Sequence, residues 1–285
     1  MKKKHTTIML TAMLCLGIFF ILYPLVSQYV NSKTSSKLIT SYNKISEKIS
    51  EEDIEKIFAD ATKYNEKLYK LKKPLLQYRS LSNYSSLVNI DKNGVMGYIT
   101  IDKIKVNVPI YHGTSKEVLN TGIGHLEGSS LPVGGVNTHS ILTGHRGLPT
   151  NRLFTDLNKL ELGDTFEITI LNKLITYEVD SIKIVKPSDI SKLQIKKGKD
   201  YVTLVTCTPY GINTHRLLVR GKRVENIDNK KIFISTEAFK INNWLVAIFI
   251  ALPILIVLMT IVLFKPVKNK KRLEKYLIDN NLKSI

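Results

Sequence analysis

Residues 200–223 read DYVTLVTCTPYGINTHRLLVRGKR, and this stretch indicates how the rest of the chain is organised. The β-branched and aromatic run at 201–206 predicts a strand with Cys207 at its carboxyl end. A proline, a glycine and an asparagine then predict a turn, after which residues 214–220 resume a strand pattern. In such a hairpin the two strand ends lie side by side. The guanidinium of Arg216 can therefore reach a group bound at the thiol.

Two apolar runs, residues 8–30 and 244–264, are free of charged side chains. At about 1.5 Å per residue, a helix formed by either run would be long enough to cross a hydrocarbon core of roughly 30 Å. The first run exceeds the apolar region of a signal peptide and has no Ala-x-Ala-like cleavage site after it, so we expect an uncleaved anchor. Lysines precede the first run and basic residues follow the second, which predicts that both termini are cytoplasmic. The segment between the spans is then extracytoplasmic.

The net charge of +18 is concentrated partly beside these spans, because residues 1–4 carry +3 and residues 265–285 carry +5. The remaining positive charge suits the anionic surface of a cell envelope, so we expect a membrane as a partner. The sequence has no motif in which basic residues alternate with base-stacking aromatic residues. We therefore expect no nucleic-acid partner.

The chain has two cysteines, and Cys15 lies within the first apolar run. Cys207 is then the sole cysteine of the external segment and cannot form an intrachain disulfide. A lone thiol outside the cell is prone to oxidation, which favours a chemical role, although a buried inert cysteine is the alternative. A cysteine thiol with the ordinary pKa of about 8.5 is only slightly ionised at neutral pH, so a nucleophilic cysteine needs a neighbouring imidazole or cation.

Five histidines lie in the segment between the spans, and their spacing does not select a partner for the thiol. His145 is the best local candidate, because it follows a predicted strand at 139–143 on a loop at the rim. We expect His112 and His125 to be hydrogen-bonded structural residues, and strand alternation points His215 away from the face of the arginine. No cluster of His, Cys, Asp or Glu has metal-ligand spacing, so we expect neither a metal nor a cofactor.

The segment before residue 94 predicts helices, and the segment after it predicts short strands. Ser50 and Asp53 form a variant of the capping box, which begins a helix that ends before Pro74. Residues 94–113 predict two strands broken near Asp102. A short helix is expected at 115–121, a strand after His139, a second short helix at 152–160, and a hairpin of 165–171 with 174–185 that turns at Asn172 and Lys173. Many short strands with few helices favour an all-β barrel or sandwich.

These features divide the chain into six parts. They are a cytoplasmic N-terminus with a transmembrane anchor (1–30), an extracytoplasmic helical stalk or lid-like region (31–93), a catalytic domain (94–226), a linker (227–243), a transmembrane helix (244–264) and a basic cytoplasmic tail (265–285).

Two motifs, HLEGSSLPVGGVNTHSILTGHRGLP at 125–149 and TLVTCTPYGINTHRLLVRGKRV at 203–224, resemble those of sortases, especially the class C group that builds pili. The resemblance covers about residues 94–224, and a second, C-terminal span is typical of that class. It implies a closed eight-stranded β-barrel with short helices. It also implies that His145, Cys207 and Arg216 are the catalytic residues, and it leaves the substrate-binding residues unassigned.

By the same resemblance, Cys207 would attack the Thr-Gly carbonyl of a Leu-Pro-x-Thr-Gly-like sorting signal on a pilin or surface-protein precursor. A lysine of another pilin subunit would then resolve the thioester. Arg216 would hydrogen-bond the oxyanion and His145 would move the protons. Attachment of surface proteins to peptidoglycan is one alternative. A membrane-tethered binding module with an inert thiol is another, from a different class of function.

Class C sortases usually carry a lid before the barrel, with an Asp-Pro-aromatic anchor over the cysteine. Residues 72–94 contain no such anchor, since their single aspartate, Asp91, is followed by Lys92 and Asn93. A divergent lid and no lid both remain open at this point. A papain-like peptidase is disfavoured, because that family places its cysteine before the histidine and this chain has the reverse order.

Overall fold

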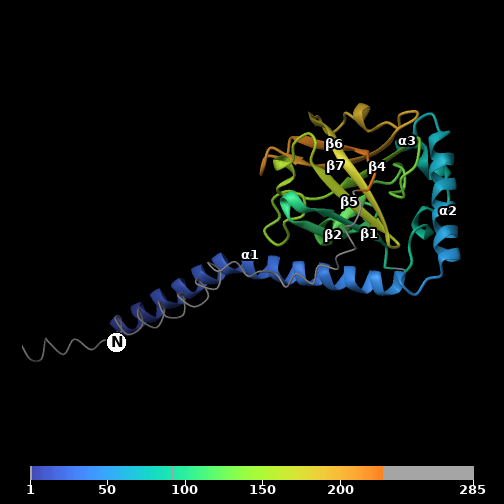
Figure 1. Cartoon of the computed structure of the whole chain (residues 1–285). Helices are drawn as coiled ribbons and strands as arrows, with labels where there is room; N and C mark the ends of the chain where they lie inside the picture. The colour runs from blue at the N-terminus through green and yellow to red at the C-terminus, as the bar shows by residue number, and fades with distance from the viewer. Residues whose placement is uncertain (1, 92, 227–285) are drawn as a thin grey trace, which may run out of the picture. The chain divides into compact units, whose positions relative to one another are not determined.

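The computed structural model describes residues 2–91 and 93–226 (Figure 1). The expected linker, second span and basic tail at 227–285 lie outside the described residues. The chain divides into two compact units, of which Leu22–Ile232 contains every strand found among the described residues. Helix α1 (Lys2–Ser46) begins in the other unit, and its segment Thr11–Ser46 is long and apolar enough to cross a membrane. This helix is compatible with the predicted N-terminal anchor.

Eight strands form a closed barrel in the order β1-β2-β3-β4-β7-β8-β6-β5, which confirms the predicted fold. Strand β3 is parallel to β2 and β7 is parallel to β4, whereas the other neighbours are antiparallel. The strands are β1 (Val95–Ile101), β2 (Val106–His112), β3 (Ile123–His125), β4 (Thr138–Thr143), β5 (Thr165–Ile170), β6 (Lys173–Val185), β7 (Asp200–Thr208) and β8 (His215–Arg223).

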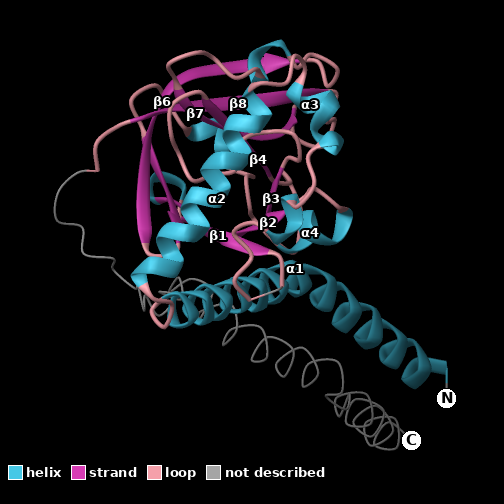
Figure 2. Cartoon of the chain, turned by 90° about the vertical axis from the view of Figure 1, so that its right-hand side faces the viewer, coloured by secondary structure: helices cyan, strands magenta, loops and turns pink. Residues whose placement is uncertain are grey.

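Helix α2 (Glu51–Tyr69) runs along the outside of the barrel (Figure 2). The predicted cap is present, because the Ser50 hydroxyl accepts a hydrogen bond of 3.1 Å from the backbone N–H of Asp53. The stripe of Ile54, Ala61 and Leu68 is buried and belongs to the same apolar cluster as the barrel interior. Burial of this stripe therefore fixes α2 against the barrel.

The end of α1 is also attached to the barrel. The buried hydroxyl of Tyr42 donates to the carbonyl of Met96 in β1 at 2.7 Å and accepts from the N–H of Leu171 at 3.1 Å. Farther back along the helix, the Gln28 and Asn31 amides donate to the carbonyls of residues 149 and 150 at 3.0 and 2.7 Å. Helix α1 is continuous through residue 31, where the composition of the sequence becomes polar.

Three details differ from the sequence expectations. Strand β3 was not predicted, because it has only three residues and a central glycine. Residues 157–159 form a short 3-10 helix, η4 (Leu157–Lys159), where a longer helix was expected. The hairpin of β5 and β6 turns at Leu171 and Asn172, whose φ angles of 47° and 64° suit a two-residue turn that matches the strand twist. The sequence pattern assigned the apolar Leu171 to the end of the strand, so it placed the turn one residue too late.

Candidate active site

Cys207 and Arg216 are cross-strand partners in the antiparallel pair of β7 and β8. Directly opposite residues in such a pair point to the same face, with Cβ atoms about 5 Å apart. Both side chains are partly exposed, as a nucleophile and an anion-binding group must be. The structure therefore brings together two of the three residues that were predicted to be catalytic.

His145 lies just beyond β4, which pairs with β7 on the side away from β8. The last pair of that parallel ladder is Thr143 with Val205, and the Gly144 N–H continues it by donating to the Val205 carbonyl at 3.1 Å. The Thr206 hydroxyl donates to the Gly144 carbonyl at 2.8 Å. His145 directly follows Gly144, and Cys207 directly follows Thr206. The register thus brings residue 145 to the β4 side of Cys207 and Arg216 to its β8 side.

Arg146 holds this loop in position, and the sequence analysis missed it. Its Nη1 donates to the Thr208 hydroxyl at 3.1 Å and its Nη2 donates to the Asn158 amide oxygen at 2.9 Å. The side chain therefore links the histidine loop to the residue that follows Cys207. An arginine directly after the candidate histidine was the available signal.

Gly144 is required by close packing. A Cβ at this position would lie 2.5 Å from the Cδ1 of Ile123 and 2.9 Å from the Cδ2 of Phe154, both of which are buried. Such distances are shorter than carbon atoms tolerate, so a larger residue would push the loop away from the barrel. The glycine therefore allows the chain to leave β4 close to the barrel and to deliver His145 beside β7.

Burial lowers the pKa of His145 below its ordinary value. The neutral imidazole consequently predominates at neutral pH, and one ring nitrogen is free to accept a proton. Arg216 Nη1 donates to the carbonyls of Asn213 and His215, each at 3.1 Å. Within the part of the chain that the structure describes, its Nε and Nη2 have no hydrogen-bond acceptor, so they remain available to a ligand.

The other external histidines have hydrogen-bonding roles away from the thiol. His112 Nε2 lies 2.7 Å from the Leu87 carbonyl, and His125 Nε2 lies 2.8 Å from the Ser130 carbonyl, as expected for structural residues. His139 is buried, with Nε2 2.7 Å from the Thr203 hydroxyl. His215 is the ladder partner of Thr208 and alternates with Arg216 along β8. His145 therefore stays the predicted partner of Cys207, since its loop follows the pairing of β4 with β7.

The segment before the barrel also contacts the face that carries the thiol. Ile141, Val205 and Leu218 form a buried cluster there, and Leu75 of helix α3 (Pro74–Gln77) packs against it. The position where an Asp-Pro-aromatic anchor was sought thus holds a proline followed by an aliphatic residue. This segment therefore packs against the cluster that contains Val205, two residues from Cys207 on β7, with a sequence that differs from the expected anchor.

Comparison with known proteins identifies the family of the barrel domain. A sortase-domain family model matches residues 99–224. Sortase C1 from Streptococcus agalactiae is 53% identical, with a TM-score of 0.61, and the match covers 67% of this chain and 100% of that structure. Sortase C from Clostridium perfringens, solved with the C-terminal cell wall sorting motif, is 43% identical, with a TM-score of 0.59, and the match covers 67% of this chain and 99% of that one.

Curated relatives match over a shorter region. Sortase D from Bacillus subtilis is 33% identical over 131 residues, which are 45% of this chain and 63% of that protein. Sortase A from Staphylococcus aureus is 31% identical over 151 residues, which are 52% of this chain and 66% of that protein. The chain thus covers slightly less than two thirds of these two relatives. With the fold and the full coverage of the solved sortase C1, these matches show that the chain belongs to the sortase family of cysteine transpeptidases.

Proposed function

We propose that this protein is a pilus-assembly sortase. It cleaves a Leu-Pro-x-Thr-Gly-like sorting signal between Thr and Gly and joins the new carboxyl end to a lysine amine of a pilin subunit. The observation that supports the proposal is the strand register, in which Cys207 pairs with Arg216 and the residue before Cys207 is hydrogen-bonded to the residue before His145. The likeness to class C structures supports the choice of substrate, since the structure of Streptococcus pneumoniae sortase C, which is 40% identical, provides insights into pilin substrate specificity.

Acylation begins with the neutral imidazole of His145, which takes the proton of the Cys207 thiol. The thiolate attacks the threonine carbonyl carbon, and the carbonyl oxygen becomes an oxyanion. Arg216 donates hydrogen bonds to this oxyanion without losing its own proton. The C–N bond then breaks, the imidazolium gives its proton to the leaving glycine amine, and a thioester remains on Cys207.

Transfer reverses these proton movements. A lysine amine attacks the thioester carbonyl, while the now neutral His145 accepts a proton from the nitrogen. Arg216 stabilises the second oxyanion as it did the first. The C–S bond breaks, the thiolate regains a proton from the imidazolium, and an isopeptide bond joins the two polypeptides. An amine acceptor therefore competes with water, and deprotonation of the amine by His145 favours transfer.

We further propose that residues 8–30 and 244–264 both span the membrane, with the barrel outside and both termini in the cytoplasm. The apolar helix α1 supports the first span. Protease added to intact protoplasts should digest the barrel and spare residues 265–285. Cleavage of the tail with an intact barrel would contradict this topology.

The proposed function is tested by incubating the full-length protein in detergent with a pilin precursor that carries a sorting signal. We expect covalent polymers on a denaturing gel and a lysine isopeptide bond by mass spectrometry, with none formed by Cys207→Ala. Transfer to a peptidoglycan-type amine but not to pilin lysines would instead identify a sortase that attaches proteins to the cell wall. Absence of both products, with a folded protein, would leave the non-enzymatic binding module.

A further inference from the structure

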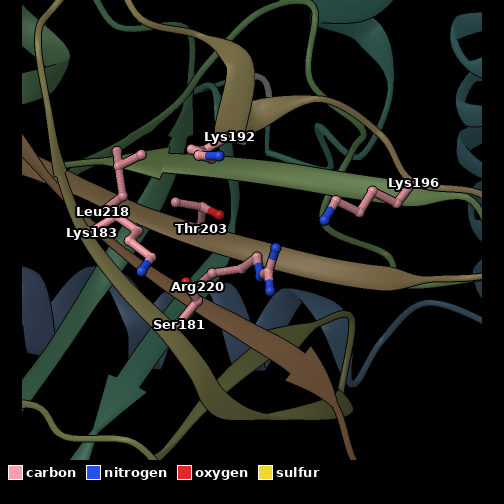
Figure 3. A pocket seen from close by; sticks show the side chains of 7 residues that line it. All are labelled: Ser181, Lys183, Lys192, Lys196, Thr203, Leu218 and Arg220. Carbon is pink, nitrogen blue, oxygen red and sulfur yellow. The ribbon is translucent and has the colours of Figure 1, made fainter.

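A basic pocket of about 210 Å³ opens on the outer surface of strands β6, β7 and β8. Lysines at positions 183, 192 and 196 contribute ammonium groups to its lining, and Arg220 contributes a guanidinium (Figure 3). Two of these lysines belong to the loop between β6 and β7, so the pocket joins a sheet face to a loop. No carboxylate is among the residues that line it.

The strand register connects this pocket to the site of chemistry. Thr203 lies four residues from Cys207 on β7, and Leu218 and Arg220 lie two and four residues from Arg216 on β8. Even separations along a strand keep side chains on the same face. At about 3.3 Å per residue, the pocket is roughly 7 to 13 Å from the thiol, which an extended peptide crosses in about two to four residues.

The positive charge in the pocket is only partly compensated. Arg220 forms a two-point ion pair with Asp180, at 2.8 and 2.9 Å, and lies over the ring of Tyr201 at 4.2 Å. Lys183, Lys192 and Lys196 form no ion pair with any residue in the ranges 2–91 and 93–226. Three ammonium groups that no ion pair among the described residues neutralises favour an anionic ligand in the pocket.

The pocket floor keeps this arrangement in place. Buried His139 contacts the Thr203 hydroxyl at 2.7 Å and the Gln194 carbonyl at 3.0 Å. Burial lowers the pKa of His139 to about 4, so the ring is neutral. Because a carbonyl can only accept, Nδ1 carries the proton, and Nε2 accepts from the hydroxyl of Thr203. This bridge fixes the loop that carries Lys192 and Lys196 to the sheet.

We propose that this pocket binds a carboxylate side chain of the substrate polypeptide, two to four residues from the scissile bond. The inference rests on the proposed function, since that function brings an extended polypeptide to Cys207 on this same face. A carboxylate in the pocket would pair with the free lysines and favour acidic sorting segments over neutral ones. The pocket is thus a specificity site, separate from the residues that perform the chemistry.

The test compares sorting-signal peptides that differ only by Glu or Gln, either at the x position of the Leu-Pro-x-Thr-Gly motif or at the second to fourth positions after the Thr-Gly bond. With the full-length enzyme, at least one Glu peptide should have a KM about five- to tenfold lower than its Gln partner, with kcat unchanged. High salt should reduce the difference. The double variant Lys192→Gln with Lys196→Gln should abolish it. The matched variant Lys197→Gln with Lys199→Gln removes two exposed lysines of the same loop that do not line the pocket, and it should preserve the preference.

Equal KM values for every Glu and Gln pair would overturn the proposal while leaving the proposed function intact. If no peptide is turned over, the proposed function has failed. The same pairs are then compared by fluorescence anisotropy on Cys207→Ala protein, where equal affinities again overturn the proposal. Polyglycerol phosphate serves as a competing probe. If the double variant loses binding to this polymer while all peptide pairs bind alike, the pocket binds an anionic polymer and the proposal is wrong.

Discussion

Cys207 of β7 and Arg216 of β8 face each other directly across an antiparallel ladder. Both residues are held by backbone hydrogen bonds of the barrel, so their separation does not depend on a flexible loop. Arg216 Nη1 is further fixed by the carbonyls of Asn213 and His215. In the proposed mechanism, a guanidinium held in this way is preorganised for the oxyanion that forms beside the thiol.

We expect Arg216→Lys to lower kcat/KM by about 10² to 10³, because an ammonium cannot reproduce the planar fork of donors. Acyl transfer from a sorting-signal peptide to hydroxylamine measures the effect. Arg223→Lys is the matched control, since Arg223 lies at the far end of β8 and contacts the ring of Tyr177 at 6.0 Å. Near-normal turnover by Arg216→Lys, or an equal loss in the control, would assign the oxyanion to another group.

Arg146→Ala should lower kcat about tenfold or more with a smaller change in KM, because the loop that carries His145 loses its links to Thr208 and Asn158. Steady-state kinetics and circular dichroism separate this effect from unfolding. Arg152→Ala provides the comparison, because Arg152 is exposed and forms a surface ion pair with Asp156 in the same loop region. If both variants retain full kcat, Arg146 does not position the histidine.

The stability of the fold should fall as the pH is lowered from 7 to 5. Burial lowers the pKa values of His125 and His139 to about 4, whereas the unfolded value is about 6.5. Between pH 6.5 and pH 4 the unfolded chain binds protons that the folded chain excludes. Lowering the pH from 7 to 5 therefore lowers the free energy of unfolding by about 2 kcal/mol per histidine. The carboxyl pKa values of Asp156 and Asp164 are lowered below 3.8, so these groups titrate outside the range from pH 7 to pH 5.

Denaturant unfolding at pH 7 and pH 5 measures this dependence. The variant His139→Gln should be less stable at pH 7, because it disturbs the contacts to Thr203 and Gln194, yet its stability should change less with pH. The same pH dependence in the variant and the wild type would show that His139 does not titrate in this way.

The sequence predicted the features that depend on neighbouring residues. The hairpin of β7 and β8 follows from two apolar runs separated by a proline and glycine turn, and the cap at Ser50 follows from a local motif. His145 was selected because it follows a strand, although no local pattern could show that β4 lies parallel to β7. Parallel pairing joins residues 62 positions apart in the chain, and spacing does not encode such contacts.

Other features required the three-dimensional structure for similar reasons. The role of Gly144 depends on Ile123 and Phe154, which approach it from different segments. The basic pocket collects lysines from β6 and from the following loop, and in the sequence they look like ordinary solvated charges. Leu75 occupies the cysteine-bearing face without the expected motif, because burial there requires an apolar side chain and not a particular anchor.

The central claim is that Cys207 carries the acyl intermediate. The most direct measurement is intact-protein and peptide mass spectrometry after a short incubation of the full-length protein with a sorting-signal peptide. We predict a mass gain equal to the peptide up to its threonine, located on Cys207, released by hydroxylamine and absent in Cys207→Ala. An adduct on another residue, or product formed at the normal rate by Cys207→Ala, would contradict the claim.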